Sequence, residues 1–438
     1  MSFRDGRMQT MRPVAPNRSA IVGVLDIGTH KVVCLVARLK PRQSKDVLRL
    51  RTHSVDILGI GHTEARGMKG GTVVNLAQAE EAVRIAVEHA ESAAGVELES
   101  VVVAVSAGRL SSELYEAAVN VTGGTIVDGD IARVLDAGSR HSVRGDRMVL
   151  HSLPIGFALD GVRGIREPRG MLASRFGVDM HVVTTDAGAA RNLMLTIERC
   201  HIGVETMVAA PYVAALGVLA DDEAELGAAI IDMGAGTTTT AVFSGGRFVH
   251  ADGFALGGHH VTMDIARGLN TRIDVAERIK TFYGNVIGSG SDERDMISVP
   301  SLSEDDHESP QFTSRGSLVR MIKPRVEEIL EMVRDRLMAS PFAAEPRGRV
   351  ILTGGASQLA GLGDLASRIL NRPVRIGRPL GVSGLPDAAK GPAFAVAAGL
   401  LVYPQAAHLE HFEPRHTRHL MTGTGYIARV GRWLRESF

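Results

Sequence analysis

The chain has 438 residues, which suggests about three structural units and more than one hydrophobic core. Lysine and arginine total 49, as do aspartate and glutamate, so the net charge is zero and no overall positive field attracts nucleic acid. Two cysteines, Cys34 and Cys200, exclude a disulfide framework and indicate a reducing compartment. The longest apolar stretches, 209–220 and 393–403, are shorter than the roughly 20 residues of a membrane span. No transmembrane segment is expected.

The N-terminal 19 residues combine arginines with two prolines and lack the apolar core of a secretion signal, so a flexible cytosolic arm is expected there. Aromatic residues make up 4% of the chain and glycines number 49. This composition favours tight turns and β-branched strands over an aromatic sandwich core, and strand-like runs of Val, Ile and Leu alternate with helical periodicity. An α/β fold follows.

One pattern occurs in both halves of the chain. Residues 22–29 and 229–237 each read as a strand that reaches an aspartate, continues into a Gly-containing turn and leads to a second strand, at 31–39 and 238–243. A repeated hairpin unit predicts a duplicated fold with one copy in each half.

The two repeated turns carry groups suited to phosphate. The first, from Asp26 to Lys31, offers a carboxylate, a glycine that allows close backbone approach, a hydroxyl and an amine, and the turn from Asp232 to Thr238 repeats the design. Either turn alone is compatible with an ordinary hairpin. Two such turns facing each other predict a clamp around a polyphosphate and its Mg²⁺.

Two further stretches are candidates for nucleoside contacts. A buried strand at 350–353 ends in Gly354 and Gly355, which would let a flat base or ribose lie against the backbone. Glu277 and Lys280 lie three residues apart on one helical face. A plain strand-to-helix turn and a surface ion pair are the respective alternatives.

Small residues dominate two helical stretches, 209–217 and 393–399. Alanines and glycines let two helices cross closely, which fits a hinge between lobes. The alternative is that alanine-rich segments are simply good helices in any core.

Together these motifs resemble the superfamily of actin, chaperone ATPases and sugar kinases. Over residues 20–438 the chain more closely resembles the FtsA family of actin-like bacterial cell-division proteins. The stretches that carry the closer resemblance are 26–31, 103–108, 276–284, 351–356 and the ending 432–438.

The resemblance implies an actin-like ATPase fold: two lobes with duplicated βαβ cores around a nucleotide cleft, plus an inserted α/β subdomain. It also implies ATP and Mg²⁺ as cofactors, with Asp26 and Asp232 near the metal through water. The implied nucleotide contacts are Asp26, Gly28, Thr29 and Lys31; Asp232, Gly234, Gly236, Thr237 and Thr238; Gly257 and Gly258; Glu277 and Lys280; and Gly354, Gly355, Ala356 and Gln358.

The resemblance also divides the chain into an arm, two lobes, an insert, a linker and a tip. The expected ranges are 1–19 (arm); 20–95 and 186–217, with 384–403 returning (first lobe); 96–185 (insert); 218–266 and 330–383 (second lobe); 267–329 (its smaller subdomain); 404–424 (linker) and 425–438 (amphipathic helix). Residues 289–317 are expected to form an exposed acidic loop before a helix at 318–338.

At 100° per residue, the last segment places its apolar side chains on one arc and its basic ones opposite, as in helices that lie on an anionic membrane surface. The residues expected to touch the membrane are Tyr426, Ile427, Arg429, Val430, Arg432, Trp433, Leu434, Arg435 and Phe438. The alternative is a helix docked on the protein itself. His408, His411, His416 and His419 are interpreted as solvated linker residues without a metal.

Hydrolysis is expected to be slow, polymer-dependent or lacking, because residues 210–215 carry no carboxylate or amide to orient a water; Asp232 is the candidate for placing Mg²⁺ and water. The resemblance implies a polymerising protein that anchors the FtsZ ring to the inner face of the cytoplasmic membrane at the septum and helps recruit later division proteins. The basic residues Arg320, Lys323 and Arg325 are candidates for binding the acidic C-terminal peptide of FtsZ. The alternatives are an actin-like pilus-assembly protein and a small-molecule kinase or chaperone-type ATPase.

Overall fold

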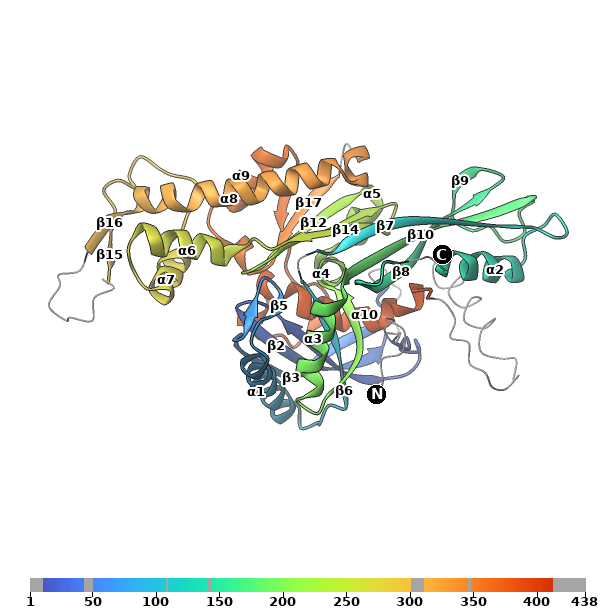
Figure 1. The fold of residues 1–438 in the computed structure, drawn as a ribbon, viewed down its shortest axis with the longest axis horizontal. Coiled ribbons are helices and arrows are strands. Elements are labelled where there is room, and N and C mark those ends of the chain that lie inside the picture. Colours follow the sequence, from blue (N-terminus) through green and yellow to red (C-terminus); the bar gives the residue numbers. More distant parts are fainter. Residues whose placement is uncertain are drawn as a thin grey trace.

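The computed structural model describes residues 11–42, 50–107, 109–140, 143–300, 311–345 and 348–412. The expected membrane-binding residues, and His416 and His419, lie outside these ranges. The described chain forms two central lobes, with an insert at one end and a smaller subdomain at the other (Figure 1). Buried apolar side chains form three separate clusters.

The first lobe is built on a six-stranded sheet in the order β11-β6-β1-β2-β3-β19. Strands β1, β2 and β3 pair antiparallel, and β6 and β11 run parallel to β1. The Val-, Leu- and Ile-rich middle parts of β1, β2 and β6 are buried on both faces, as expected for central strands covered by helices. The bounds are β1 (Ala20–Ile27), β2 (Lys31–Pro41), β3 (His53–Glu64), β6 (Ser100–Val105), β11 (Gly203–Ala209) and β19 (Val382–Ser383).

The second lobe repeats this plan with the order β14-β13-β12-β17-β18. Again three antiparallel strands are followed by two parallel ones, so β14-β13-β12-β17-β18 corresponds to β3-β2-β1-β6-β11 of the first lobe. The predicted duplication is therefore confirmed. The bounds are β12 (Ala228–Met233), β13 (Thr238–Ser244), β14 (Arg247–Phe254), β17 (Arg349–Thr353) and β18 (Val374–Ile376).

The insert is a four-stranded sheet, β7-β10-β8-β9, with helix α2 packed on one face and its own buried cluster. It extends to the right in Figure 1. The bounds are β7 (Ser111–Asn120), α2 (Asp128–Ser139), β8 (Arg147–Leu159), β9 (Val162–Ile165) and β10 (Arg175–Asp186).

The smaller subdomain of the second lobe differs from the sequence prediction. The expected acidic loop contains two paired strands, and its Asp292 is buried, where it accepts hydrogen bonds from the backbone and hydroxyl of Ser289. Alternating apolar residues at 297 and 299 supply the buried face of this hairpin. The bounds are α6 (Gly258–Gly268), α7 (Ile273–Tyr283), β15 (Met296–Val299), β16 (Gln311–Ser314) and α8 (Arg315–Met338).

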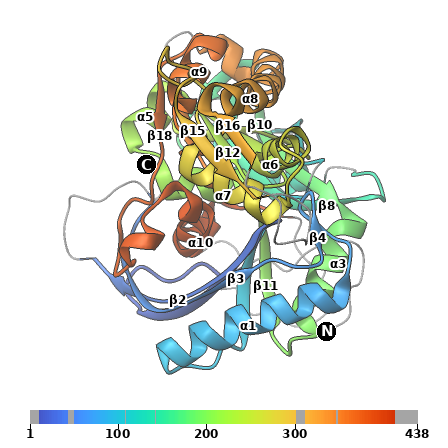
Figure 2. The same ribbon diagram turned by 90° about the vertical axis from the view of Figure 1, so that its left-hand side faces the viewer.

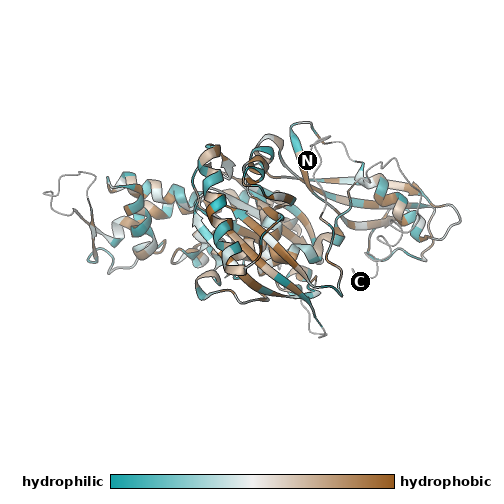
Figure 3. Ribbon diagram, turned by 90° about the horizontal axis from the view of Figure 1, so that it is seen from below, coloured by the Kyte–Doolittle hydropathy of each residue, from teal (hydrophilic) through white to brown (hydrophobic). Residues whose placement is uncertain are grey.

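The remaining helices cover the two sheets, and α1 lies along the first-lobe sheet in Figure 2. Seen from below, apolar strands occupy the centre while polar residues gather on the helices outside (Figure 3). Two short strands pair beside the first turn. These elements are β4 (Met68–Lys69), β5 (Thr72–Val73), α1 (Leu76–Ala94), α3 (Ala187–Glu198), α4 (Ala210–Val218), α5 (Asp221–Leu226), α9 (Leu362–Leu370) and α10 (Ala395–Ala406), with 3₁₀ turns at 341–344, 355–358, 387–389, 392–394 and 407–409.

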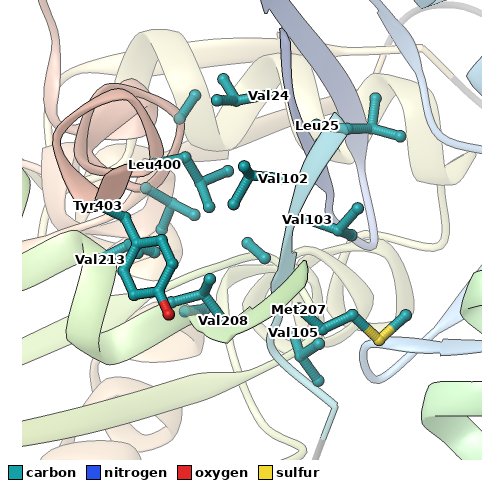
Figure 4. Close-up of a cluster of buried hydrophobic side chains, with 14 of the residues drawn as sticks. Val24, Leu25, Val102, Val103, Val105, Met207, Val208, Val213, Leu400 and Tyr403 are labelled. Atoms are coloured by element: carbon teal, nitrogen blue, oxygen red, sulfur yellow. The ribbon is translucent and has the colours of Figure 1, made fainter. Parts of the chain in front are cut away.

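Helices α4 and α10 cross closely, as their small residues predict. A Cβ added to Gly399 would lie 1.6 Å from the carbonyl oxygen of Val213, and one added to Gly217 would lie 2.4 Å from that of Ala395. Figure 4 shows Leu400 and Tyr403 of α10 and Val213 of α4 packed with side chains of β1, β6 and β11. Only glycine permits this approach of two helix backbones.

One described helical stretch, Pro392–Leu409, has the length and composition of a membrane span, which the prediction from uninterrupted apolar runs missed. Within the protein 78% of that stretch is buried. It therefore has the packing of a core helix of the first lobe.

The first and last described segments, which begin at Met11 and end at residue 412, pack more closely than expected. The predicted linker begins inside α10, and residues 407–412 continue along the insert, where partial burial of His411 lowers its pKa to about 4. The predicted flexible arm contributes Met11 to the core, and the N–H of Val14 donates to the carbonyl of Pro404 at 3.1 Å. The Nδ1–H group of His408 donates to the carbonyl of Gln405 at 2.7 Å, so the interpretation of His408 and His411 as solvated is wrong.

Candidate nucleotide site between the two lobes

The two predicted phosphate turns have the same local structure. In the first, the N–H of Gly28 donates to the carbonyl of Lys31 at 2.9 Å, and in the second the N–H of Gly234 donates to the carbonyl of Thr237 at 2.9 Å. The turns also meet: a Cβ on Gly236 would lie 2.3 Å from Oγ1 of Thr29. The strands on either side therefore bring both turns to one place between the lobes.

Two carboxylates lie where the turns meet, one buried (Asp232) and one partly buried (Asp26). Asp26 and Asp232 are the next-to-last residues of β1 and β12, and burial raises the pKa of Asp26 to about 6 and that of Asp232 to about 7. The negative charge of Asp26 raises the pKa of Asp232 further, while Lys31 opposes both shifts. Two carboxylates that repel each other are suited to a shared cation.

The amine of Lys31 lies near both carboxylates and is held from one side. It donates to the carbonyl of Ala393 at 2.6 Å and lies 3.6 Å from the centre of the Phe394 ring. Burial lowers its pKa, and the two aspartates partly offset that effect. Lys31 thus links the first turn to the start of α10.

Glycines let the remaining predicted segments approach these turns. A Cβ on Gly354, whose φ is +84°, would lie 2.4 Å from Oδ1 of Asp232, and a Cβ on Gly257 would lie 2.4 Å from the carbonyl oxygen of Gly234. Gly258 brings its Cα against Ala356, with the amine of Lys280 close by. The third and fourth predicted elements therefore converge on the second turn.

Glu277 and Lys280 of α7 form a half-buried pair, with their Oε2 and Nζ atoms 2.7 Å apart. Thr262 of α6 completes the group, because its hydroxyl accepts from Lys280 at 2.8 Å and donates to Glu277. The lysine also donates to the carbonyl of Gly258 at 3.1 Å. Glu277 keeps a lowered pKa despite its burial because Lys280 and Thr262 stabilise its charge.

Some predicted contacts are already used within the protein. The hydroxyl of Thr238 donates to the carbonyl of Leu256 at 2.8 Å, and the exposed amide of Gln358 donates to the carbonyl of Gly355 at 3.3 Å. Sequence reasoning missed Thr262 and Phe394. The spacing of Thr262, four residues after Gly258 on one helix face, could have indicated the first, whereas no local pattern indicates the second.

The three basic candidates for a peptide site lie on α8 with different exposure. Arg320 is 64% exposed and pairs with Glu293, and Lys323 is 46% exposed with its Nζ 3.6 Å from Glu327. Arg325 is 27% exposed and binds Asp264 of α6 at 2.7 Å. The first two are therefore more accessible than the third.

The duplicated sheets and facing turns define an actin-like ATPase fold. Among solved structures the chain resembles the PilM-PilN type IV pilus biogenesis complex, with a TM-score of 0.58 and 17% identity over 88% of this chain and 98% of that one. It also resembles MreB 5 of Spiroplasma citri bound to AMPPNP, with a TM-score of 0.53 and 14% identity over 89% and 96% of the two chains. At these identities the likeness shows the fold alone.

Sequence comparison identifies the family. Residues 229–399 match the family model for cell division protein FtsA, and residues 107–184 match the SHS2 domain inserted in FtsA. The FtsA proteins of Agrobacterium fabrum and Escherichia coli K12 are 52% and 32% identical, over 98% and 97% of this chain and 97% and 99% of their own lengths. The chain belongs to the FtsA family of cell-division proteins, as its motifs predict.

Proposed function

We propose that this chain binds ATP with Mg²⁺, polymerises on the inner face of the cytoplasmic membrane, and anchors the FtsZ ring there while recruiting later division proteins. Membership of the FtsA family supports the division role. The nucleotide part rests on one observation, the two aspartates with raised pKa values on facing turns of duplicated sheets.

The residues present fit Mg-ATP. Asp26 and Asp232 offer hard oxygen ligands, and among the described residues no group of three or more His, Cys, Asp or Glu side chains could hold a metal unaided. Mg²⁺ would then take its other ligands from water and phosphate oxygens, and would neutralise phosphate charge. The two turns would hold the phosphates, Glu277 and Lys280 the ribose and adenine, and residues 354–358 the nucleoside.

Turnover would be slow or depend on the polymer. Helix α4 begins at Ala210 and Pro211, and its first turn carries no carboxylate or amide that could orient an attacking water. Asp232 is the group that would place Mg²⁺ and its waters. Nucleotide binding would therefore serve mainly to set the angle between the lobes.

The FtsZ peptide would bind near α8. Arg320 and Lys323 are exposed cations on one helix beside the β15–β16 hairpin, and cations suit an acidic peptide. The segment 425–438 would supply membrane attachment through its apolar arc and basic face. Both assignments are independent of the nucleotide site.

A titration with fluorescent ATP and Mg²⁺ tests whether the two facing turns bind nucleotide. Asp26→Asn removes a charge next to the metal and should weaken binding by about tenfold or more. Asp274→Asn, at an exposed carboxylate that begins α7, is the matched control and should bind as the wild type does. Equal affinity of the Asp26→Asn variant and the wild type would mean that the nucleotide lies elsewhere.

A further inference from the structure

Beyond α10 the chain turns inward and buries a glutamate. The Glu410 side chain is 4% exposed, its Oε1 atom lies 2.6 Å from Nδ1 of His151, and its Oε2 atom accepts from the N–H of Ser152 at 3.0 Å. The next residue donates its own N–H to the carbonyl of Ser152 at 2.8 Å. The segment after α10 is thus bonded to β8 of the insert.

His151 also contacts the first lobe. Its ring is fully buried, and its Nε2 atom accepts from the N–H of Ala209 at 2.9 Å. Because Nε2 accepts, that nitrogen carries no proton, and the ring proton on Nδ1 is the one donated to Glu410. The two hydrogen bonds fix both the tautomer and the orientation of the ring.

Ala209 lies where the nucleotide site is built. It ends β11 and precedes α4, and β11, β6 and β1 are parallel neighbours. Carboxyl ends of parallel strands lie at one edge of a sheet, so Ala209 shares its edge with the Asp26 turn. Glu410, His151 and Ala209 therefore connect the segment after α10 with the edge that holds the first phosphate turn.

The surroundings of this connection are unusually aromatic for a chain with so few aromatic residues. The ring of Tyr212 on α4 stacks on that of Phe248 of β14, with the ring centres 4.6 Å apart. The ring of His151 meets that of Tyr212 edge-on, with the ring centres 4.9 Å apart. His181 of β10 meets Phe248 at 4.8 Å. Rings from the insert, the first lobe and the second lobe form one packed junction, which favours joint movement over independent movement.

We propose that Glu410 is a positioning residue that, through His151, couples the segment after α10 and the insert to the nucleotide edge of the first lobe. The coupling rests on the proposed ATP binding. Helix α10 lies between the two connected places and crosses α4, so a change of lobe angle on nucleotide binding would move the ends of this connection together. The segment that leads toward the membrane-binding residues would then respond to nucleotide.

Replacing Glu410 with glutamine would break the connection with little change of volume. The glutamate presents one oxygen to the His151 N–H and the other to the Ser152 N–H. A glutamine has one oxygen and one NH₂ group, so in either orientation one of these donors faces another donor. The Tyr403 hydroxyl also forms a hydrogen bond with Glu410, but it cannot replace the carboxylate oxygen that the His151 or Ser152 N–H would lose.

Hydrogen–deuterium exchange of the full chain with and without Mg-ATP tests the coupling. In the wild type, Mg-ATP should slow exchange at both phosphate turns and also in β8 and residues 407–412. In Glu410→Gln the turns should still respond, while the response of β8 and 407–412 should fall at least threefold. Glu91→Gln alters a glutamate of α1 that accepts from the N–H of Leu98, away from this connection, and should respond like the wild type.

His151→Asn should reproduce the loss, and the double variant should lose no more than either single one, because both residues belong to one path. If Glu410→Gln does not fold, Glu410→Asp retracts the carboxylate from His151 and should lose the same distant response. A wild-type level of response in Glu410→Gln overturns the coupling. A wild type that responds at the turns alone overturns the coupling but not ATP binding, and one that responds nowhere overturns both.

Discussion

A methyl group at position 399 should force the hinge helices apart. Helices α4 and α10 cross with the Cα of Gly399 against the backbone of α4, and an added Cβ would lie 1.6 Å from the carbonyl oxygen and 2.5 Å from the carbonyl carbon of Val213. Both obstacles are backbone atoms, which cannot move aside by a change of rotamer. Gly399→Ala therefore requires the helices to separate by about 1.5 Å, since interiors are close-packed.

The cost can be weighed against the gain in helix propensity. Alanine in a helix interior is favoured over glycine by about 1 kcal/mol, whereas overpacking of a well-packed core costs about 1–3 kcal/mol and occasionally more. Both helices are buried at nearly every residue, so a separation also opens space along the whole contact. Because the obstacles are backbone atoms, the overpacking cost is expected at the upper end of this range, which leaves a net loss of about 2 kcal/mol and weaker nucleotide binding.

Thermal unfolding and ATP titration of Gly399→Ala measure both effects. Gly129→Ala is the control: Gly129 lies in α2 with nothing within 4 Å of an added Cβ, so that change should be neutral or stabilising. Gly399→Ala should melt several degrees lower than the wild type and bind ATP more weakly. If it melts as high as the control with unchanged affinity, the helix crossing does not constrain the hinge.

Three further outcomes are expected. Asp232→Asn should raise the melting temperature of the ligand-free protein at pH 8, because burial and Asp26 disfavour the charged carboxylate, yet weaken Mg-ATP binding; a variant that keeps full affinity would contradict the site. Glu293→Gln should release Arg320 from its ion pair and strengthen binding of an acidic FtsZ peptide by at most about fivefold, because an exposed ion pair is weak, and weaker binding would refute the peptide assignment. Burial lowers the pKa of His181 to about 3, whereas its pKa in the unfolded chain is about 6.5. Between pH 6.5 and pH 3 the unfolded chain therefore binds a proton at this histidine that the folded protein does not bind. The free energy of unfolding should fall in this window by up to about 1.4 kcal/mol per pH unit. His181→Gln should flatten this slope in urea unfolding measured from pH 7 to pH 5, and an unchanged slope would contradict the burial argument.

The sequence predicts the fold well where local pattern and packing agree. The strands that lead to Asp26 and Asp232 have the same hairpin pattern in the sequence, and in the structure each belongs to a sheet of the same topology. Small residues such as Gly399 and Gly217 indicate the helix crossing, because only a close backbone contact explains their place. Charge and glycine spacing likewise indicate the two facing turns that we propose as the phosphate site, because each turn depends on residues close in sequence.

Contacts between distant segments are what the sequence does not predict. Glu410 lies in the stretch predicted as a linker, yet its carboxylate accepts from buried donors on β8, more than half the chain away. The contact between Lys31 and the ring of Phe394 is likewise not predictable, because nothing in the local sequence of either residue indicates the other. The many acidic residues of 289–317 favoured the prediction of an exposed loop. The alternating apolar residues at 297 and 299 were the weaker signal, although they lie in the strand β15 that pairs with β16.

Recruitment of FtsZ to membranes tests the central claim most directly. Vesicles with anionic lipid are sedimented with FtsZ and Mg-ATP, in the presence of either the full chain or a chain that ends at Thr424. FtsZ should appear in the pellet with the full chain and stay in the supernatant with the shortened one. FtsZ that remains in solution with the full chain, or that sediments equally with both, would contradict a role as membrane anchor of the division ring.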